Sequence, residues 1–206
     1  TLVLRPFLQP TDLFSLLSNE INKDSSAFTD FVQIRVDAEK NCRKEVEGRF
    51  PSREDITLDE IYEVIARDYA FDSKTIRALE AQEKALELEF TRTRKIGKEL
   101  YELAQEAGKD IIICSDMYLP QETVTEILRK NGYTGYKKLY LSSEIQRTKA
   151  TKNLYAFVKK DLKCKWGGSI LHIGDNWASD IENAAANGFE TGHLSKPVDM
   201  LQNSNP

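Results

Sequence analysis

The stretch ILHIGDNWASD, residues 170–180, decides the fold. Its apolar residues run into Gly174, and two aspartates, Asp175 and Asp180, follow five positions apart. A helical pattern then extends to residue 187 and stops at a glycine. This order predicts a buried strand, a tight turn and a helix, with Asp175 at the carboxyl end of a strand in an open α/β sheet. Ligands bind at that edge because strand ends and helix amino termini converge there.

The spacing of the two aspartates predicts a metal site. Asp180 falls in the turn or the first helical turn, so both carboxylates can face one point. Two carboxylates on one point repel each other unless a cation lies between them. A hard divalent ion such as Mg²⁺, held by one or two carboxylates plus waters, meets that need. Asp175 and Asp180 are therefore the candidate Mg²⁺ ligands. An aspartate after a strand is also often the N-cap of the next helix, and that alternative stays open.

The composition is that of a globular protein. The chain has 206 residues, of which 40% are hydrophobic and 30% charged, which is enough for one large domain or two small ones. The net charge of −4 argues against nucleic-acid binding. No apolar run approaches the roughly 20 residues of a membrane span, and the start has no signal-peptide pattern. The three cysteines are widely spaced and odd in number, so we expect a reducing, cytoplasmic environment.

The chain divides into two regions with different secondary-structure patterns. Residues 10–108 carry helical patterns only, whereas residues 109–206 alternate between strands and helices. Strands are predicted at 110–114, 138–141, 169–173 and 189–191. Such alternation implies a parallel sheet with right-handed crossovers. We therefore expect an α/β fold, in which an all-helical region, 10–108, is inserted between a first core strand within residues 1–9 and the core of residues 109–206.

The helical region shows three features that the structure can test. Thr57 and Glu60 form a capping box at the start of a helix. A longer helical pattern runs from Ser73 to Gly108, with Gly97 as a candidate interruption. Charged residues recur at helical spacing and are interpreted as solvated faces: Arg35, Glu39 and Arg43 in one helix, and Glu80, Glu83, Glu87 and Glu89 in the long one.

Polar residues follow the other predicted strands. Ser115 ends an apolar strand with a hydroxyl that can donate a hydrogen bond to a substrate oxygen, although a turn residue is the plainer interpretation. Asp116, which follows it, is interpreted as a turn or helix-cap acid. Lys149 lies just before a helix that Thr151 can cap, a position where a positive charge is unfavourable unless an anion lies nearby. A solvated lysine is the alternative, and Lys152 is a rival for the same role.

Serine, lysine and paired aspartates occur in that chain order, each at the end of a predicted strand. Because the carboxyl ends of parallel strands meet at one edge, these side chains are expected to converge there. Together they make an electrophilic, metal-assisted site suited to phosphoryl groups.

In this order the residues resemble the haloacid dehalogenase-like (HAD) superfamily. Residues 111–115 resemble its second motif, Lys149 its third and residues 174–180 its fourth, while the helical insertion resembles its cap. The segments SDMYLP (115–120), HIGDN (172–176) and TLVLRP (1–6) resemble more narrowly a bacterial branch of predicted HAD hydrolases. Members of that branch are often joined to, or encoded beside, glycosyltransferases for surface polysaccharides.

The resemblance implies Mg²⁺-dependent hydrolysis of a small phosphoester, such as a sugar or nucleotide-sugar compound, through an aspartyl-phosphate. It implies catalytic roles for Thr1, Ser115 and Lys149, and substrate contacts from Ser115, Asp116 and Lys149. Asp175 would hold the metal directly, and Asp180 directly or through water. The expected partners are a phosphorylated small molecule and a fused or neighbouring glycosyltransferase.

One departure from the family is serious. Thr1 resembles the threonine that closes the first motif, so the nucleophilic aspartate would lie four residues upstream, outside the sequence. We therefore expect the chain as given to be inactive, and whether it is an enzyme stays open. The alternatives are a non-catalytic HAD-like module that supports a glycosyltransferase, and a metal-free haloacid dehalogenase-type hydrolase. The acidic pair disfavours the second, because an uncompensated carboxylate would oppose a carboxylate nucleophile.

Overall fold

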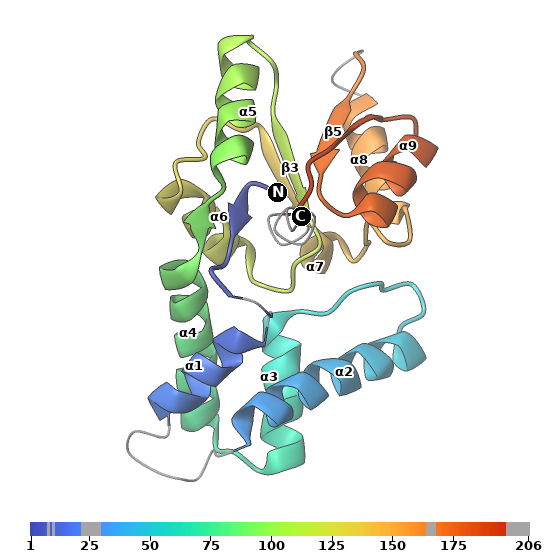
Figure 1. The fold of residues 1–206 in the computed structure, drawn as a ribbon. Helices are drawn as coiled ribbons and strands as arrows, with labels where there is room; N and C mark the ends of the chain where they lie inside the picture. Colours follow the sequence, from blue (N-terminus) through green and yellow to red (C-terminus); the bar gives the residue numbers. More distant parts are fainter. Residues whose placement is uncertain (8, 10, 22–29, 164–167, 197–206) are drawn as a thin grey trace, which may run out of the picture.

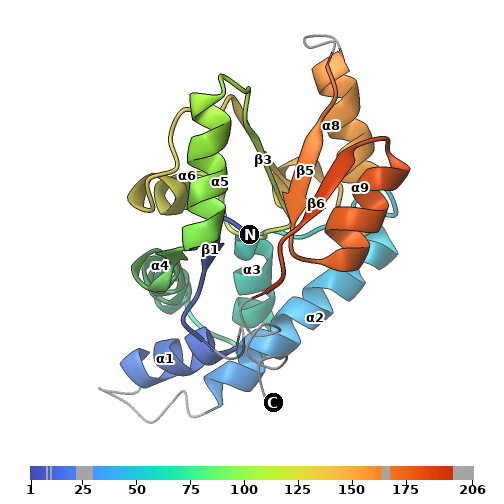
Figure 2. The ribbon, with the colours of Figure 1, turned by 45° about the horizontal axis from the view of Figure 1, so that its top comes forward.

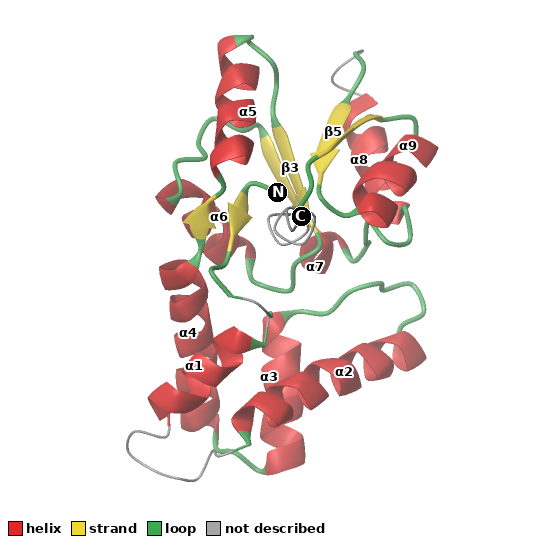
Figure 3. Ribbon diagram, in the orientation of Figure 1, coloured by secondary structure: helices red, strands yellow, loops and turns green. Residues whose placement is uncertain are grey.

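The computed structural model describes residues 1–7, 9, 11–21, 30–163 and 168–196. These residues form two lobes, one purely helical and one α/β (Figures 1 and 3). The predicted polar tail from residue 197, the start of the helix expected from residue 27, and Cys164 lie outside the described residues.

The helical lobe contains four helices among its described residues: α1 (Asp12–Ile21), α2 (Phe31–Arg49), α3 (Leu58–Tyr69) and α4 (Ser73–Phe90). The predicted capping box starts α3, since the Thr57 hydroxyl accepts from the Glu60 amide and the Glu60 carboxylate accepts from the Thr57 amide. The lobe has an apolar core that includes Leu17, Phe31 and Ile61, each fully buried. Burying one such side chain stabilises the fold by about 1.5–3 kcal/mol.

The α/β lobe follows the predicted alternation. Its elements are α5 (Lys95–Glu106), β3 (Ile112–Ser115), α6 (Gln121–Lys130), β4 (Lys138–Leu141), α7 (Ser142–Ile145), α8 (Asn153–Lys163), β5 (Leu171–Gly174), the π-helix η2 (Trp177–Glu182), α9 (Asn183–Ala186) and β6 (Glu190–His193). Strand β3 pairs in parallel with β4, and β5 pairs in parallel with β6. Parallel pairing is therefore confirmed, but the described strands form separate two-stranded sheets instead of one continuous sheet.

The expected first core strand is placed differently. Strand β1 (Val3–Leu4) pairs antiparallel with β2 (Arg92–Thr93), and not with β3. The carbonyl of Leu2 accepts hydrogen bonds from the Arg94 amide at 2.9 Å and from the Tyr133 hydroxyl at 2.5 Å. These contacts hold the start of the chain at the junction of the lobes, with Thr1 near the carboxyl ends of β3 and β5 (Figure 2).

The predicted long helix from Ser73 to Gly108 is wrong, because it is two helices, α4 and α5, separated by β2. The break lies before Gly97, which is inside α5. A Cβ at Gly97 would stand about 2.5 Å from the carbonyl oxygen of Thr1, so the glycine allows α5 to approach the start of the chain. Helical periodicity continues through the break, which is why the sequence pattern missed it.

The prediction that the charged residues of the helical region form solvated faces is wrong in part. Arg35 is fully buried, and its guanidinium donates to both carboxylate oxygens of Glu83 at 2.8 Å. The Tyr62 hydroxyl donates to the same carboxylate at 2.7 Å. Glu87 is also buried and accepts two hydrogen bonds from Arg5. Only tertiary packing decides which side of a charged helix faces the core, so spacing alone gave the wrong environment for these residues.

The division into residues 1–9, 10–108 and 109–206 stays a prediction. Helix α5, assigned to the cap by that division, packs against the α/β lobe, where the Tyr101 ring meets the Tyr133 ring edge-on at 5.1 Å. Its Tyr101 hydroxyl also donates to the Thr134 carbonyl at 3.0 Å. Within the described part of the chain, no helix combines the length and the apolar character needed to cross a membrane.

Candidate active site

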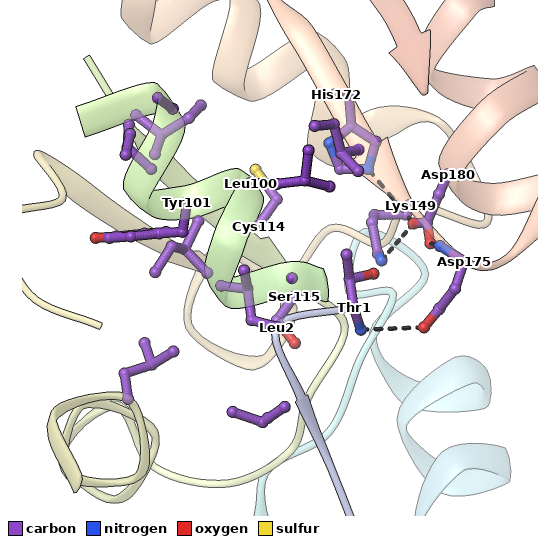
Figure 4. Close-up of a pocket in the computed structure, with 18 of the residues that line it drawn as sticks. Thr1, Leu2, Leu100, Tyr101, Cys114, Ser115, Lys149, His172, Asp175 and Asp180 are labelled. Carbon is purple, nitrogen blue, oxygen red and sulfur yellow. Dashed lines mark hydrogen bonds and ion pairs between the residues drawn. The ribbon is translucent and has the colours of Figure 1, made fainter. Parts of the chain in front are cut away.

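A cavity of about 790 Å³ lies between β3, β5 and α5. Most of its wall is apolar and comes from the two strands and from α5. Its polar residues include Thr1, Ser115, Asp116, Lys149, His172, Asp175 and Asp180. Figure 4 shows Thr1, Lys149, Asp175 and Asp180 close together. The structure thus brings every sequence-predicted site residue to one cavity.

Asp175 lies directly after β5, at the predicted carboxyl end of a strand. One of its carboxylate oxygens, Oδ2, is 3.0 Å from the Thr1 ammonium nitrogen and 3.3 Å from Nη1 of Arg94. The Asp175 side chain is 24% exposed, whereas that of Arg94 is 5% exposed. The carboxylate therefore borders the cavity and is met by two positive charges.

Asp180 is buried, and protein groups occupy both of its oxygens. Oδ1 lies 2.6 Å from the Lys149 ammonium and 3.5 Å from Nε2 of His172. Oδ2 accepts from the backbone amides of Asp175 and Asn176, each at 3.0 Å. Burial raises the pKa of Asp180, but the His172 hydrogen bond and the Lys149 charge lower it more, so its pKa lies far below the usual range. Asp180 is therefore a fixed anion.

Of the two candidate lysines, Lys149 lines the cavity and Lys152 does not. Its side chain is 15% exposed and points at Asp180, whereas Lys152 is exposed and its backbone has a positive φ of 73°. The anion expected near Lys149 is thus the carboxylate of Asp180 itself. A bound anionic ligand is not needed to explain a lysine at that position.

Ser115 and Asp116 follow one another at the end of β3 but differ in their contacts. Ser115 lines the cavity, and its hydroxyl has no hydrogen-bond partner within the described residues. Asp116 accepts hydrogen bonds from the Lys149 backbone amide at 3.0 and 3.1 Å. Asp116 thus fixes the loop that carries Lys149. Its substrate contact, like the roles assigned to the other site residues, stays a prediction.

Several solved structures share the architecture, although no protein-family model and no curated protein matches the chain. The HAD-hydrolase YfnB from Bacillus subtilis, bound to magnesium, is 18% identical over 88% of this chain and 79% of its own, with a TM-score of 0.58. The 2-haloacid dehalogenase from Pseudomonas syringae pv. Tomato DC3000 is 11% identical over 92% and 80%, with a TM-score of 0.59. The L-2-haloacid dehalogenase from Xanthobacter autotrophicus is 13% identical over 97% and 81%, with a TM-score of 0.54.

The fold is HAD-like. This confirms the expected α/β class, a HAD-like Rossmann-type core with a parallel arrangement of strands and a helical cap. At 11 to 18% identity, the similarity extends to the fold and no further. It does not reach the glycosyltransferase-associated branch.

A metal in the HAD-like site would meet one carboxylate at the edge of the cavity, that of Asp175. No group of three His, Cys, Asp or Glu side chains that could hold a metal ion occurs in the described part of the chain. Asp180 is occupied by Lys149 and backbone amides, so the two carboxylates do not share an open point as the sequence suggested. Asp175 is the more accessible of the two acids, with a side chain that is 24% exposed, but its Oδ2 already faces the Thr1 ammonium at 3.0 Å and Arg94 at 3.3 Å. Substrate oxygens, water or further carboxylates would have to complete a Mg²⁺ shell.

Sequence reasoning missed three residues of the site. Arg94 is buried and bonds Asp175 from a segment that looked like the middle of a helix. Tyr155 and His172 are hydrogen-bonded at 3.0 Å, and both lie within 3.5 Å of Asp180. His172 stood inside the deciding stretch, two residues before Gly174, and its place within the strand that leads to Asp175 was a usable signal. Arg94 gave no signal, since its contact joins residues 81 positions apart.

Proposed function

We propose that the chain is the hydrolase domain of a Mg²⁺-dependent phosphohydrolase that acts on a small phosphoester. The observation that carries this proposal is the convergence of Ser115, Lys149 and Asp175 on one cavity, at the carboxyl ends of β3 and β5. An ammonium, a hydroxyl and a carboxylate in one place suit a phosphoryl group, whose transferring oxygens need donors and positive charge.

The residues of the chain would divide the work. Lys149, held in place by Asp180, would donate to a phosphoryl oxygen. The Ser115 hydroxyl would donate to a second one, and the Thr1 hydroxyl would orient the nucleophile. Asp175 would hold Mg²⁺, which when bound supplies positive charge to the transferring oxygens. The helical lobe would close over the cavity, exclude water and select the leaving group.

The nucleophile of this proposal lies outside the sequence. An aspartate four positions before Thr1 would attack phosphorus, displace the leaving group and form an aspartyl-phosphate, which water then hydrolyses. Asp116 does not replace it, because its carboxylate accepts hydrogen bonds from the Lys149 amide. The activity is therefore proposed for a longer form that carries this aspartate, and the 206-residue chain by itself is proposed to be silent.

A metal-free hydrolase of the haloacid dehalogenase type is the second candidate. The uncompensated acidic pair argued against it, but each acid is paired with a protein cation, Asp180 with Lys149 and Asp175 with Arg94. Such a site tolerates a further carboxylate nucleophile without a metal. Two of the solved structures named above are haloacid dehalogenases, which supports this candidate at the level of the fold.

The remaining parts of the proposal rest on sequence resemblance. They are a sugar or nucleotide-sugar phosphoester as substrate, a fused or neighbouring glycosyltransferase as partner, and a cytoplasmic location. If no activity is found, the alternative is a non-catalytic module that supports such a glycosyltransferase.

The test compares two forms of the chain in one assay. One form is the 206-residue chain, and the other carries six further residues that end in Asp-Val-Asp-Val before Thr1. Both are incubated with aryl phosphates, sugar phosphates and 2-chloropropionate, each with Mg²⁺ and with a chelator. We expect phosphate release only from the longer form and only with Mg²⁺, and loss of that activity on Lys149→Ala.

Each of the other possible outcomes would favour a different function or a different nucleophile. Chloride release that survives the chelator would favour the metal-free candidate. Turnover by the 206-residue chain that withstands purification controls would place the nucleophile within it. Silence of the longer form on every substrate, with the fold intact, would favour the non-catalytic module.

A further inference from the structure

The two lobes meet at two separate places. At the first, both chain connections between the lobes lie side by side, because β1, which leads to α1, pairs with β2, which follows α4. At the second, the loop between α2 and α3 lies against α7 and the start of α8, on the far side from β1 (Figure 1). The second contact is non-covalent, so it can open while the chain connections still hold the lobes together.

Glu54, in the loop between α2 and α3, makes the densest part of the second contact. Its Oε2 accepts from the Thr148 amide at 2.8 Å and from the Thr151 hydroxyl, while Oε1 accepts from the side-chain amide of Asn153. Burial raises the pKa of Glu54, but the hydrogen bonds from these donors lower it more, so the carboxylate is charged. The three donors lie on both sides of Lys149 in the chain. A residue of the helical lobe thus holds the segment that carries the ammonium group of the site.

Other residues of the same loop hold the beginning of that segment. Nε of Arg53 donates to the side-chain oxygen of Gln146 at 2.8 Å, and Arg147 donates to the carbonyl of Ser52. The segment 146–153 also has a positive φ near each end, 57° at Gln146 and 73° at Lys152. Such a backbone conformation is uncommon outside glycine and persists only where surrounding contacts hold it. The helical lobe supplies contacts at or directly beside both positions.

The α/β lobe holds only the middle of the segment by itself. The Lys149 amide donates to Asp116, and the Asn183 side chain donates to the carbonyls of Lys149 and Ala150, each at 3.0 Å. The Lys149 ammonium meets Asp180. The middle of the segment is therefore fixed from one lobe and its two ends from the other.

We propose that Glu54 is a positioning residue for Lys149, so that closing the two lobes and fixing the ammonium group in the cavity are one event. When the second contact opens, the ends of the segment 146–153 are released and the Lys149 side chain becomes loosely held. When it closes, the ammonium group is fixed beside Asp180. This inference rests on the proposed function in one respect, that Lys149 meets a phosphoryl group, whereas its placement is a property of the chain without substrate.

The experiment uses four variants of the 206-residue chain. Glu54→Gln keeps the shape of the side chain but removes its charge and one acceptor. Glu47→Gln makes the same change at an exposed glutamate of α2 and is the matched control. Asn153→Asp places a second carboxylate opposite Glu54, although an acid by itself suits the start of α8. The double variant Glu54→Gln with Asn153→Asp reverses the pair, since the new amide can donate to the new carboxylate while its oxygen still accepts from the Thr148 amide.

The readouts are chosen at groups that do not touch Glu54. Hydrogen exchange is measured at the amides of Lys149 and Lys152, which donate to Asp116 and to the Lys149 carbonyl. Acetylation of the Lys149 ammonium by acetic anhydride is measured relative to that of the exposed Lys152. Exchange of the amides of β4 reports whether the α/β lobe as a whole has loosened.

Glu54→Gln and Asn153→Asp are each expected to speed exchange of both amides at least about fivefold and acetylation of Lys149 at least about threefold, with β4 unchanged. Glu47→Gln should change neither readout, and the double variant should return to within about twofold of wild type.

Three results would overturn the positioning role of Glu54. They are unchanged exchange and acetylation at Lys149 in Glu54→Gln, equal acceleration in β4, and a double variant no better than either single one. Because no substrate is used, the failure of the hydrolase proposal would produce none of them.

Discussion

The ammonium nitrogen of Lys149 lies 2.6 Å from Oδ1 of Asp180, and both groups are largely buried. The other carboxylate oxygen accepts from the amides of Asp175 and Asn176. A residue in the loop before α8 is thereby tied to the turn after β5. This pair joins the two halves of the candidate site and sets the position of the ammonium group.

Replacement of Lys149 by Met is expected to destabilise the fold by about 3 kcal/mol, because it leaves Asp180 as a buried carboxylate without its cation. Lys152→Met is the matched control, since Lys152 is exposed and lies three residues away. Its effect should stay within about 0.5 kcal/mol. Urea unfolding measures both, and equal losses would contradict the role of Lys149 as the partner of Asp180.

Gly174 is expected to tolerate no side chain. A Cβ at this position would overlap the Cβ of Asp180, whereas a Cβ at Gly192 in the neighbouring strand would lie 3.5 Å from Ile173, an ordinary contact. Gly174→Ala should therefore cost about 1–3 kcal/mol and displace Asp180, and Gly192→Ala should cost less. Denaturant unfolding of both variants tests this difference. A harmless Gly174→Ala variant would show that the turn after β5 can move.

The buried pair of Arg35 and Glu83 should dominate the polar energetics of the helical lobe. Arg35→Met is expected to destabilise the protein by about 3–5 kcal/mol, because Glu83 then remains buried without a cation. Arg49→Met, on the same helix but exposed, should change stability by less than about 0.5 kcal/mol.

A double-mutant cycle sharpens this prediction. Arg35→Met combined with Glu83→Met should recover much of the loss, since both charges leave together. Additive losses would mean that the two residues act independently.

Glu60 should give α3 a pH-dependent stabilisation. The hydrogen bonds from Arg53 lower the pKa of Glu60, burial opposes them, and the Thr57 amide adds to the lowering. A folded-state pKa below the unfolded value means that the stabilisation is present above about pH 4.3 and is lost as the pH falls through the folded value. The difference in unfolding free energy between wild type and Glu60→Gln should therefore be largest near pH 7 and shrink below pH 4.

Glu63→Gln, which changes an exposed glutamate on the same helix, is the control for that titration. Because that side chain is exposed, its replacement should change the unfolding free energy by less than about 0.5 kcal/mol. A Glu60→Gln difference that grows toward low pH would reverse the assigned direction.

Mg²⁺ should raise the thermal midpoint of the chain, and Asp175→Asn should reduce this gain more than Asp116→Asn. Asp175 borders the cavity and attracts a cation, whereas Asp116 bonds the Lys149 amide. Thermal scans with and without Mg²⁺ test both variants. Equal reductions, or no Mg²⁺ effect in any form, would contradict Asp175 as the metal ligand.

Much of the fold could be predicted from local sequence patterns. Four strands after residue 109 were expected, and β3, β4, β5 and β6 lie at or within a few residues of those positions. The capping box at Thr57 needed only two residues three positions apart. Local signals failed between α4 and α5, where the helical periodicity of the sequence continues although the helix is interrupted. The interruption is the pairing of β2 with β1, and a helical pattern contains no information about such a contact.

The sequence predicted several residues that line the cavity, but not how their charged side chains pair. The ends of predicted strands pointed to Ser115 and Asp175, because parallel strands bring their carboxyl ends together. The pairing of Asp180 with Lys149, and of Asp175 with Arg94, could not be read from spacing. These pairs depend on segments that meet only in the folded chain.

The sequence by itself determined the order of strands and helices after residue 109 and the parallel pairing of those strands, because hydrophobic periodicity and strand-end positions are local properties. The tertiary structure alone decided which charges are buried and which cations meet the two aspartates. Arg35 shows the reason, because its sequence spacing suits a solvated face while packing places it beside Glu83, 48 residues away. Burial and charge pairing depend on distances in space, which spacing along the chain does not contain.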